Sequence, residues 1–225
     1  MKKEIVAILM ACFLLSSCNN ALIGDDNSKS VTVLEEKDDI KKTYDAKKYF
    51  DENYIDEHKL PILDIHVENP FVSDDRVLVL EDSIENNIEL MIYEYYHNRM
   101  SGAYQKVKDA IRGKNLIMAT ENEEKNFKEG IYYNKITLDE IDVVDKDEVN
   151  NITEANKQSI ICQLDESGMT QFAIVEVEKT IILNKKFKSM GPQVDDGHTT
   201  RYYLVGEKDG AYKIVEVYWE GFLYD

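Results

Sequence analysis

DSIENNIELMIYEYYHNRMSGAYQKVKDAIR is the sequence of residues 82–112, and the rest of the chain is organised around it. Apolar residues recur in its first half at the spacing of one helix side, at Ile84, Ile88, Met91, Ile92 and Tyr95. This period predicts an amphipathic helix, because residues three and four apart share one side of an α-helix. We expect the apolar side to pack on the strands that follow.

The ends of this helix are marked by capping and breaking residues. Asp82 is the expected N-cap, with Glu85 three positions later as in a capping box. Ser101-Gly102 is a poor pair for a helix interior, so the helix should break there. A second helix is expected from Tyr104 until Gly113 ends it.

After Gly113 the sequence alternates mainly with the period of strands. We expect a short helix at 121–128 and strands at 131–144, 158–166, 169–184, 200–206 and 211–219. Ser167-Gly168 and Asp209-Gly210 are typical of the turns between paired strands. The predicted fold class is therefore α+β, with the N-terminal helices packed on one face of a curved antiparallel sheet.

The residues before this stretch predict further segments. A charged, weakly amphipathic helix is expected within 37–58, ended by Pro61, and short extended segments at 63–67 and 77–80. The expected organisation is a signal peptide at 1–17, a flexible tether at 18–36, the charged helix and extended segments at 37–81, and the α+β domain at 82–225.

The first eighteen residues resemble the signal of a bacterial lipoprotein. Lys2 and Lys3 precede an apolar run, Ile5 to Leu15, that is too short to span a bilayer. Leu15-Ser16-Ser17-Cys18 is similar to the lipobox, whose cysteine receives a diacylglyceryl group and becomes the first residue after cleavage. The resemblance implies that Cys18 is lipidated and anchors the chain at the extracytoplasmic side of a cell membrane.

Charge and cysteine usage limit the partners and bonds that the chain can form. Its net charge of -17 at pH 7 has no basic stripe, so we expect no nucleic-acid partner. If Cys12 leaves with the signal and Cys18 is lipidated, only Cys162 remains and no internal disulfide can form. Cys162 alternates with Ile160 and Leu164, so we expect it to be a small core residue on a strand.

The order of helix, small-residue break, helix and strands is similar to that of the nuclear-transport-factor-2-like family, whose fold is a cone-shaped α+β structure. The likeness is carried by Ile88 to Tyr96, the passage from Asn98 to Tyr104, and the terminal strands from Arg201 to Trp219. It extends over residues 82–225 and implies a cone-like domain. Enzymes of this superfamily use an Asp or His inside the cone as general base, and none of their motifs transfers residue by residue to this chain.

His97 is the candidate catalytic base. It shares a helix side with Leu90 and Tyr93, and an imidazole that titrates near pH 7 suits proton transfer. Tyr93 or Tyr104 would then be the hydrogen-bond donor. We favour the alternative of a histidine in the seam between helices, because no carboxylate lies at a defined spacing from it.

Aromatic residues are the candidates for binding. Tyr95, Tyr203 and Trp219 belong to a set of aromatics on the helices and strands that would line a pocket for an apolar or sugar-like ligand. The same spacing is typical of a filled core, which is the more frequent outcome.

Two short motifs invite a metal interpretation. His66 and Glu68 lie two apart on an extended segment and lack a third ligand. Asp195-Asp196-Gly197-His198 gathers carboxylates at a turn but lacks the alternating ligands of an EF-hand. We therefore expect no metal site and no cofactor.

Three functions remain open. The first is a non-enzymatic, membrane-anchored module that binds a small ligand or an envelope protein. The second is an isomerase- or hydrolase-type enzyme that uses His97 with a tyrosine. The third is a structural docking module whose core is filled, which an open cavity would argue against.

Overall fold

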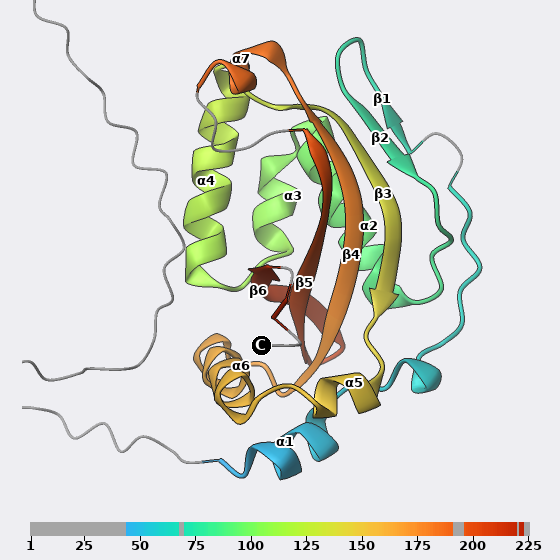
Figure 1. Cartoon of the computed structure of the whole chain (residues 1–225), viewed down its shortest axis with the longest axis vertical. Coiled ribbons are helices and arrows are strands. Elements are labelled where there is room, and N and C mark those ends of the chain that lie inside the picture. Colours follow the sequence, from blue (N-terminus) through green and yellow to red (C-terminus); the bar gives the residue numbers. More distant parts are fainter. Residues whose placement is uncertain (1–43, 68–69, 191–195, 220, 223–225) are drawn as a thin grey trace, which may run out of the picture. The chain divides into compact units, whose positions relative to one another are not determined.

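The computed structural model describes residues 44–67, 70–190, 196–219 and 221–222. They belong to one compact unit that runs from Lys42 to Asp225. This unit has the α+β fold class that the sequence predicts, with helices around a curved, open, six-stranded sheet (Figure 1). Cys18 and the predicted signal peptide and tether lie outside the described residues.

The elements follow one another in the order that Figure 1 labels. The helices are α1 (Ala46–Asn53), the 3₁₀ helix η1 (Glu57–Lys59), α2 (Asn87–Ser101), α3 (Tyr104–Asp109), α4 (Lys114–Lys128), α5 (Lys146–Asn150), α6 (Glu154–Ser167) and α7 (Lys185–Lys188). The strands are β1 (Phe71–Val72), β2 (Val77–Leu80), β3 (Tyr133–Val143), β4 (Gln171–Leu183), β5 (Gly197–Lys208) and β6 (Ala211–Trp219).

Each strand pairs with its neighbours in the sequence, in the spatial order β1-β2-β3-β4-β5-β6. All pairs are antiparallel except β2 and β3, which run parallel because α2, α3 and α4 carry the chain back between them. The predicted turn between β5 and β6 is confirmed: Asp209 and Gly210 have φ values of 55° and 79°, as a tight hairpin requires.

Helices cover both faces of the sheet, whereas the sequence predicted one covered face. Alternate residues of β4 separate the two sides: Val175 and Val177 pack with α2, α3 and α4, while Phe172 and Ile174 pack with α1 and α6. We call the side of Val175 and Val177 the inner face and the opposite side the outer face. At the lower end of Figure 1, α1, α5 and α6 lie together around the outer-face core that contains Phe172 and Ile174.

The predicted start of the first helix is wrong. The N-cap of α2 is Asn86, whose Oδ1 accepts hydrogen bonds from the backbone N–H groups of Ile88 at 3.0 Å and Glu89 at 3.1 Å. Glu89 in turn accepts from the backbone N–H of Glu85, the residue before the cap, so Asn86 and Glu89 form a variant of the capping box that the sequence predicted at Asp82 and Glu85. Ile84 lies before the helix and bridges Ile65, within the predicted extended segment 63–67.

The predicted strand at 158–166 is also wrong, because these residues form α6. Thr153 is its N-cap, and Gly168 ends it in the left-handed region at φ 71° instead of turning a hairpin. Ile160, Ile161 and Leu164 are fully buried on one helix side. Cys162 is consequently a half-buried helix residue and not a small core residue of a strand.

Other predicted elements agree with the structure or extend it. The break at Gly102 is confirmed, since this residue ends α2 at φ 80°. The helix expected at 121–128 is longer and forms α4. Within the described part of 37–58, the charged helix is α1.

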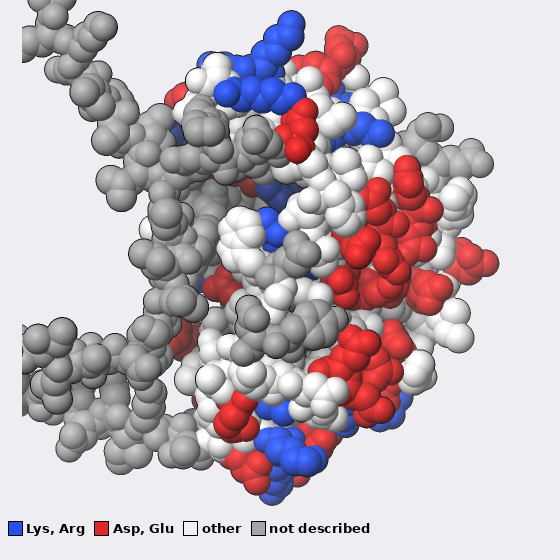
Figure 2. Space-filling model, viewed as in Figure 1, with Lys and Arg blue, Asp and Glu red and all other residues white. Residues whose placement is uncertain are grey.

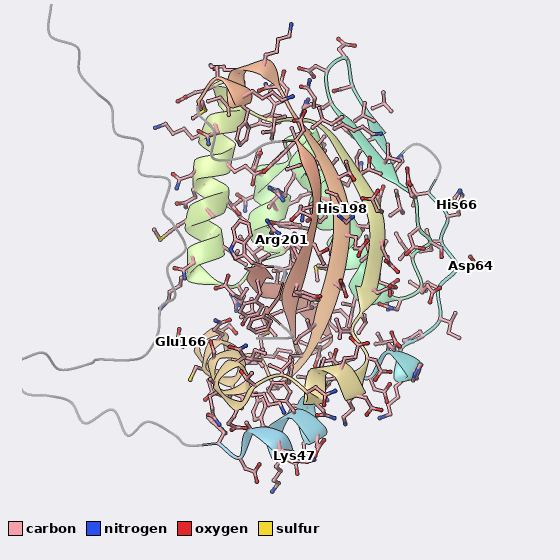
Figure 3. All side chains as sticks on the ribbon, viewed as in Figure 1. Lys47, Asp64, His66, Glu166, His198 and Arg201 are labelled. Carbon is pink, nitrogen blue, oxygen red and sulfur yellow. The ribbon has the colours of Figure 1, made fainter. Side chains whose placement is uncertain are left out.

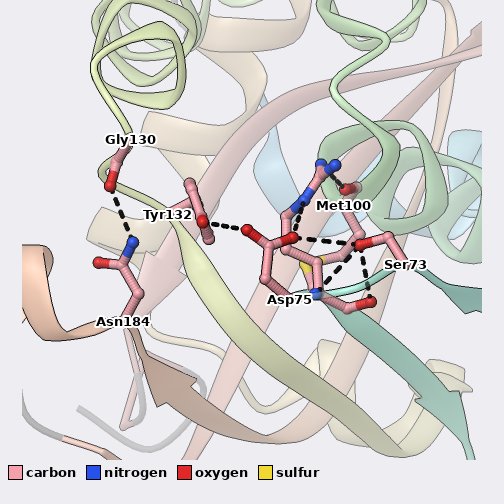
Figure 4. Close-up of polar contacts among 7 residues, drawn as sticks. Ser73, Asp75, Met100, Gly130, Tyr132 and Asn184 are labelled. Atoms are coloured by element: carbon pink, nitrogen blue, oxygen red, sulfur yellow. Dashed lines mark hydrogen bonds and ion pairs between the residues drawn. The ribbon is translucent and has the colours of Figure 1, made fainter.

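A polar network fastens the β1–β2 hairpin to its neighbours (Figure 4). The guanidinium of Arg76 donates to the carbonyl of Met100 at the end of α2, and it lies 4.7 Å from the ring centroid of Phe127. Tyr132 donates to the carboxylate of Asp75. The hairpin is thereby held against both α2 and the start of β3.

Candidate functional site

The inner face changes from apolar to charged along β4. Ala173, Val175 and Val177 point to this face and are fully buried, as expected for core residues of a central strand. The next residue with the same orientation is Lys179, which is only 8% exposed. A charged side chain therefore occupies a position that the strand period assigns to an apolar one.

Two tyrosines enclose the ammonium group of Lys179. Its Nζ lies 5.4 Å from the ring centroid of Tyr96 and 5.9 Å from that of Tyr203. The hydroxyl groups of Tyr96 and Tyr203 hydrogen-bond to each other. Among the described residues, no carboxylate or carbonyl oxygen accepts a hydrogen bond from this ammonium, which is held by cation–π contacts.

Arg99 provides a second cation on this face, and it is paired. Its Nε and Nη2 donate to the two carboxylate oxygens of Glu123 of α4 at 3.0 and 2.9 Å, a bidentate pair between two helices. The hydroxyl of Tyr104 also donates to Glu123 at 3.2 Å. Glu123 is thus committed to Arg99 and Tyr104 and does not neutralise Lys179.

Arg201 adds a third cation from β5. The register places it beside Val177 of β4 and opposite Trp219 of β6, whose ring centroid lies 3.8 Å from its guanidinium carbon. Trp219 is 62% exposed, so this stack stands where the inner face meets solvent. Figure 3 shows Arg201 in the middle of the molecule, far from Lys47 on α1.

The charges of this face shift the pKa values of its members. Burial and the positive charges of Arg201 and Arg99 hold the pKa of Lys179 well below its usual range. Burial also raises the pKa values of Tyr96 and Tyr203, which stay protonated at neutral pH. The face therefore offers hydroxyl donors and cations, with Glu123 as the carboxylate that balances Arg99.

The structure brings together two of the three aromatic residues that the sequence proposed for binding. Tyr95 and Tyr203 are buried with ring centroids 6.1 Å apart, whereas Trp219 is exposed and stacks on Arg201 on the same face of the strands. The sequence analysis missed Lys179, Arg99, Glu123 and Arg201. The sequence does contain a signal for Lys179 and Arg201. Each is a charged residue at a strand position whose alternate neighbours are mostly apolar and point to the inner face.

His97 and Tyr104 lie in different surroundings. His97 contacts the rings of Phe71 of β1 and Tyr93, with centroids 5.9 and 6.1 Å away. Tyr104 packs on Phe127 and donates to Glu123. Within the described residues, no carboxylate forms a hydrogen bond or ion pair with His97, so the geometry shows an aromatic environment around this histidine.

The remaining histidines contact acidic or apolar surfaces. His66 lines a shallow pocket of about 290 Å³ with Val67, Pro70 and β2, whereas Glu68 lies outside the described residues. His198 lies between Glu178 and Asp139, with its Nε2 at 3.5 and 3.7 Å from their oxygens. Asp196 accepts from the backbone N–H of Leu183 and pairs with Lys188.

One exposed group that the sequence analysis did not single out could hold a metal ion. Glu57, His58 and Asp145 each offer a ligand atom, and these atoms lie within 4.8 Å of one another. Such groups are common on acidic surfaces, and neither of the two predicted metal motifs contributes to it.

The outer face is acidic where helices leave it uncovered. Figure 2 shows red side chains gathered over β3 and β4 on the right of the view. Asp142 lies on this face, and burial together with Glu140 raises its pKa to about 6. The sheet thus separates an acidic outer surface from a cationic and aromatic inner one.

Comparison of the chain with family models, curated proteins and solved structures gives no match. Within the described residues, every helix is too short or too polar to span a bilayer. The site is therefore interpreted from its own geometry.

Proposed function

We propose that this protein is a membrane-anchored cell-envelope lipoprotein whose α+β domain is a non-enzymatic binding module. The proposal joins two parts of the chain. Lipidation at Cys18 would anchor it on the extracytoplasmic side of a membrane, and the inner face around Lys179 would bind a small ligand or a segment of an envelope protein.

The binding role rests chiefly on one observation: among the described residues, no carboxylate pairs with Lys179, the cation in the inner face. A module that served only as a filled docking core would gain stability from an apolar residue at position 179, because burying a charge costs free energy. Retaining Lys179 there is explained by a ligand. The resemblance to cone-shaped domains supports the same role, since such folds enclose a cavity beside their curved sheet.

The anchor is supported by the sequence of residues 2–18, in which a basic start, a short apolar run and Leu15-Ser16-Ser17-Cys18 follow in order. Two or more acyl chains on one residue would hold a protein stably at a membrane, where a single chain gives marginal binding.

The anchor is tested by expression in a bacterial host that is fed an alkyne analogue of palmitate. Wild-type chain should be labelled, and Cys18→Ser should lose the label and accumulate as uncleaved precursor. Cys12→Ala, which removes the other cysteine of the signal region, should be labelled like the wild type. Undiminished labelling of Cys18→Ser would refute the anchor.

The binding role is tested by a thermal-shift screen of the full-length chain in neutral detergent against metabolites, envelope sugars, lipids and divalent ions. A ligand of the native state raises the unfolding midpoint with the logarithm of its concentration. A concentration-dependent rise for one compound class supports the binding module. A screen without any rise favours the docking module with a filled core.

A further inference from the structure

Among the described residues, the inner face carries one cation, Lys179, that no carboxylate pairs with. Its titratable groups among the described residues are Tyr95, Tyr96 and Arg99 of α2, Tyr104 of α3, Glu123 of α4, Tyr133 of β3, Lys179 of β4, and Arg201 and Tyr203 of β5. Glu123 forms a bidentate pair with Arg99, so it does not pair with Lys179. Lys179 then faces two guanidinium groups, both of which disfavour its ammonium form.

The ammonium of Lys179 has hydrogen-bond donors that an anion could accept from. It can donate three hydrogen bonds, and among the described residues it makes cation–π contacts with Tyr96 and Tyr203 and no hydrogen bond. The side chain is 8% exposed, and no fully buried side-chain nitrogen or oxygen among the described residues lacks a hydrogen bond, so the ammonium of Lys179 still reaches solvent. A bound anion would replace water as its acceptor and lower the cost of the partly buried charge.

The surroundings of the ammonium also indicate the chemical nature of the rest of the ligand. The rings of Tyr96 and Tyr203 flank Nζ, and the exposed ring of Trp219 lies on the same face beyond Arg201. Blue side-chain atoms are visible below the surrounding surface near the middle of the view in Figure 2. Aromatic walls beside a single ammonium suit an anionic group attached to an apolar or aromatic body.

We propose that Lys179 is the anchor of a site for an organic anion, a small molecule with one carboxylate or phosphate group on an aromatic or apolar body. The anionic group lies on the Lys179 ammonium, and the body lies against the tyrosine rings towards Trp219. This inference rests on the proposed binding function, since it names the ligand class of the same face.

The test uses benzoate and phenyl phosphate as probes and benzamide as their neutral counterpart, with the full-length chain in neutral detergent. Trp219 is the sole tryptophan of the chain, so its emission reports binding on this face directly. Benzoate or phenyl phosphate should change the emission in a saturable way, and benzamide should not. The apparent affinity should decrease as the pH rises, because Lys179 loses its proton above its lowered pKa.

Lys179→Met is the decisive variant, and Lys47→Met is its matched control. The first should weaken binding of the anions by about tenfold to hundredfold, the range for losing a charge-assisted hydrogen bond. The second removes an exposed lysine of α1 that pairs with Asp51, and it should leave binding unchanged. Lys179→Met should also raise the unfolding midpoint by about 3 °C or more, since it removes a desolvated charge.

The outcomes separate this inference from the proposed function. Equal binding of benzamide and benzoate, or equal binding of benzoate to wild type and Lys179→Met, overturns the anion site and leaves a binding module in place. If none of the three probes binds, the anion site is overturned, and the wider screen decides the binding role independently. Lys179→Gln repeats the comparison with a polar neutral side chain of similar length.

Discussion

Glu89 is a buried carboxyl group at the start of α2, only 2% exposed. Its oxygens accept hydrogen bonds from the backbone N–H of Glu85 at 2.6 Å and the side-chain amide of Asn86 at 2.5 Å. Burial outweighs both bonds and raises its pKa from 4.5 to about 7. The folded protein therefore keeps a proton that the unfolded chain has lost in this pH range. Its free energy of unfolding should fall as the pH rises from 4.5 to about 7.

We expect Glu89→Gln to remove this pH dependence. Relative to the variant, wild-type stability should fall by roughly 1–3 kcal/mol across that window. A constant loss will accompany the change, because the amide nitrogen cannot accept the hydrogen bond from Glu85. Urea unfolding at a series of pH values measures the difference, with the exposed Glu121→Gln of α4 as control. Parallel pH profiles for wild type and Glu89→Gln would contradict the assignment.

At the scale of elements, local signals decided which predictions held. Asp209-Gly210 predicts its turn from two adjacent residues. The long alternation of apolar and polar residues in β4 predicts a strand. Ile160, Cys162 and Leu164 fit the strand period, but Ile160 and Leu164 fit equally well the buried side of a helix that Ile161 completes. The N-cap Thr153 and the C-terminal Gly168 resolve that ambiguity in favour of the helix.

The residues of the candidate site also differ in whether a local sequence signal reveals them. Lys179 could be recognised from its phase on β4, because one strand contains the whole signal. The pair of Arg99 and Glu123 could not, since it joins α2 to α4 across an arrangement that only packing defines. The same holds for the approach of Tyr96 to Tyr203.

The helical state of α6 can be tested at its N-cap. Thr153 accepts a hydrogen bond from the backbone N–H of Asn156 at 3.3 Å, so Thr153→Ala should lower the free energy of unfolding by about 1 kcal/mol. Ser159→Ala, at an exposed interior position of the same helix, should be neutral or slightly stabilising. Denaturant unfolding measures both. An unchanged stability for Thr153→Ala would argue against the cap.

At the scale of the whole molecule, negative charge is concentrated on one side of the sheet. The outer face carries Asp139, Glu140, Asp142, Glu176 and Glu178 on adjoining strands. The chain as a whole has a net charge of -17 at pH 7. Mutual repulsion of these groups should weaken the folded state at low ionic strength, and added salt should screen it.

We therefore expect the unfolding midpoint to rise with sodium chloride concentration at pH 8, and Asp142→Asn to reduce that rise. The variant should also be more stable than wild type at low salt, by about 2 °C in midpoint, because the pKa of Asp142 near 6 shows that its charged form is disfavoured. Glu166→Gln removes one charge from the exposed side of α6 and should keep the wild-type salt response. Identical salt responses for Asp142→Asn and wild type would exclude this source of repulsion.

The parallel pairing of β2 with β3 has a consequence for the order in which the chain acquires its structure. β3 to β6 form successive antiparallel pairs, whereas β2 must wait for α2, α3 and α4 before it meets β3. α1 depends on still later residues, since Ile55 after it bonds to Phe172 of β4. Phe50 and Leu78, which are fully buried in the fold, therefore gain their partners only when strands far along the chain are available. The first described elements thus depend for their burial on residues that follow them by about 60 to 120 positions.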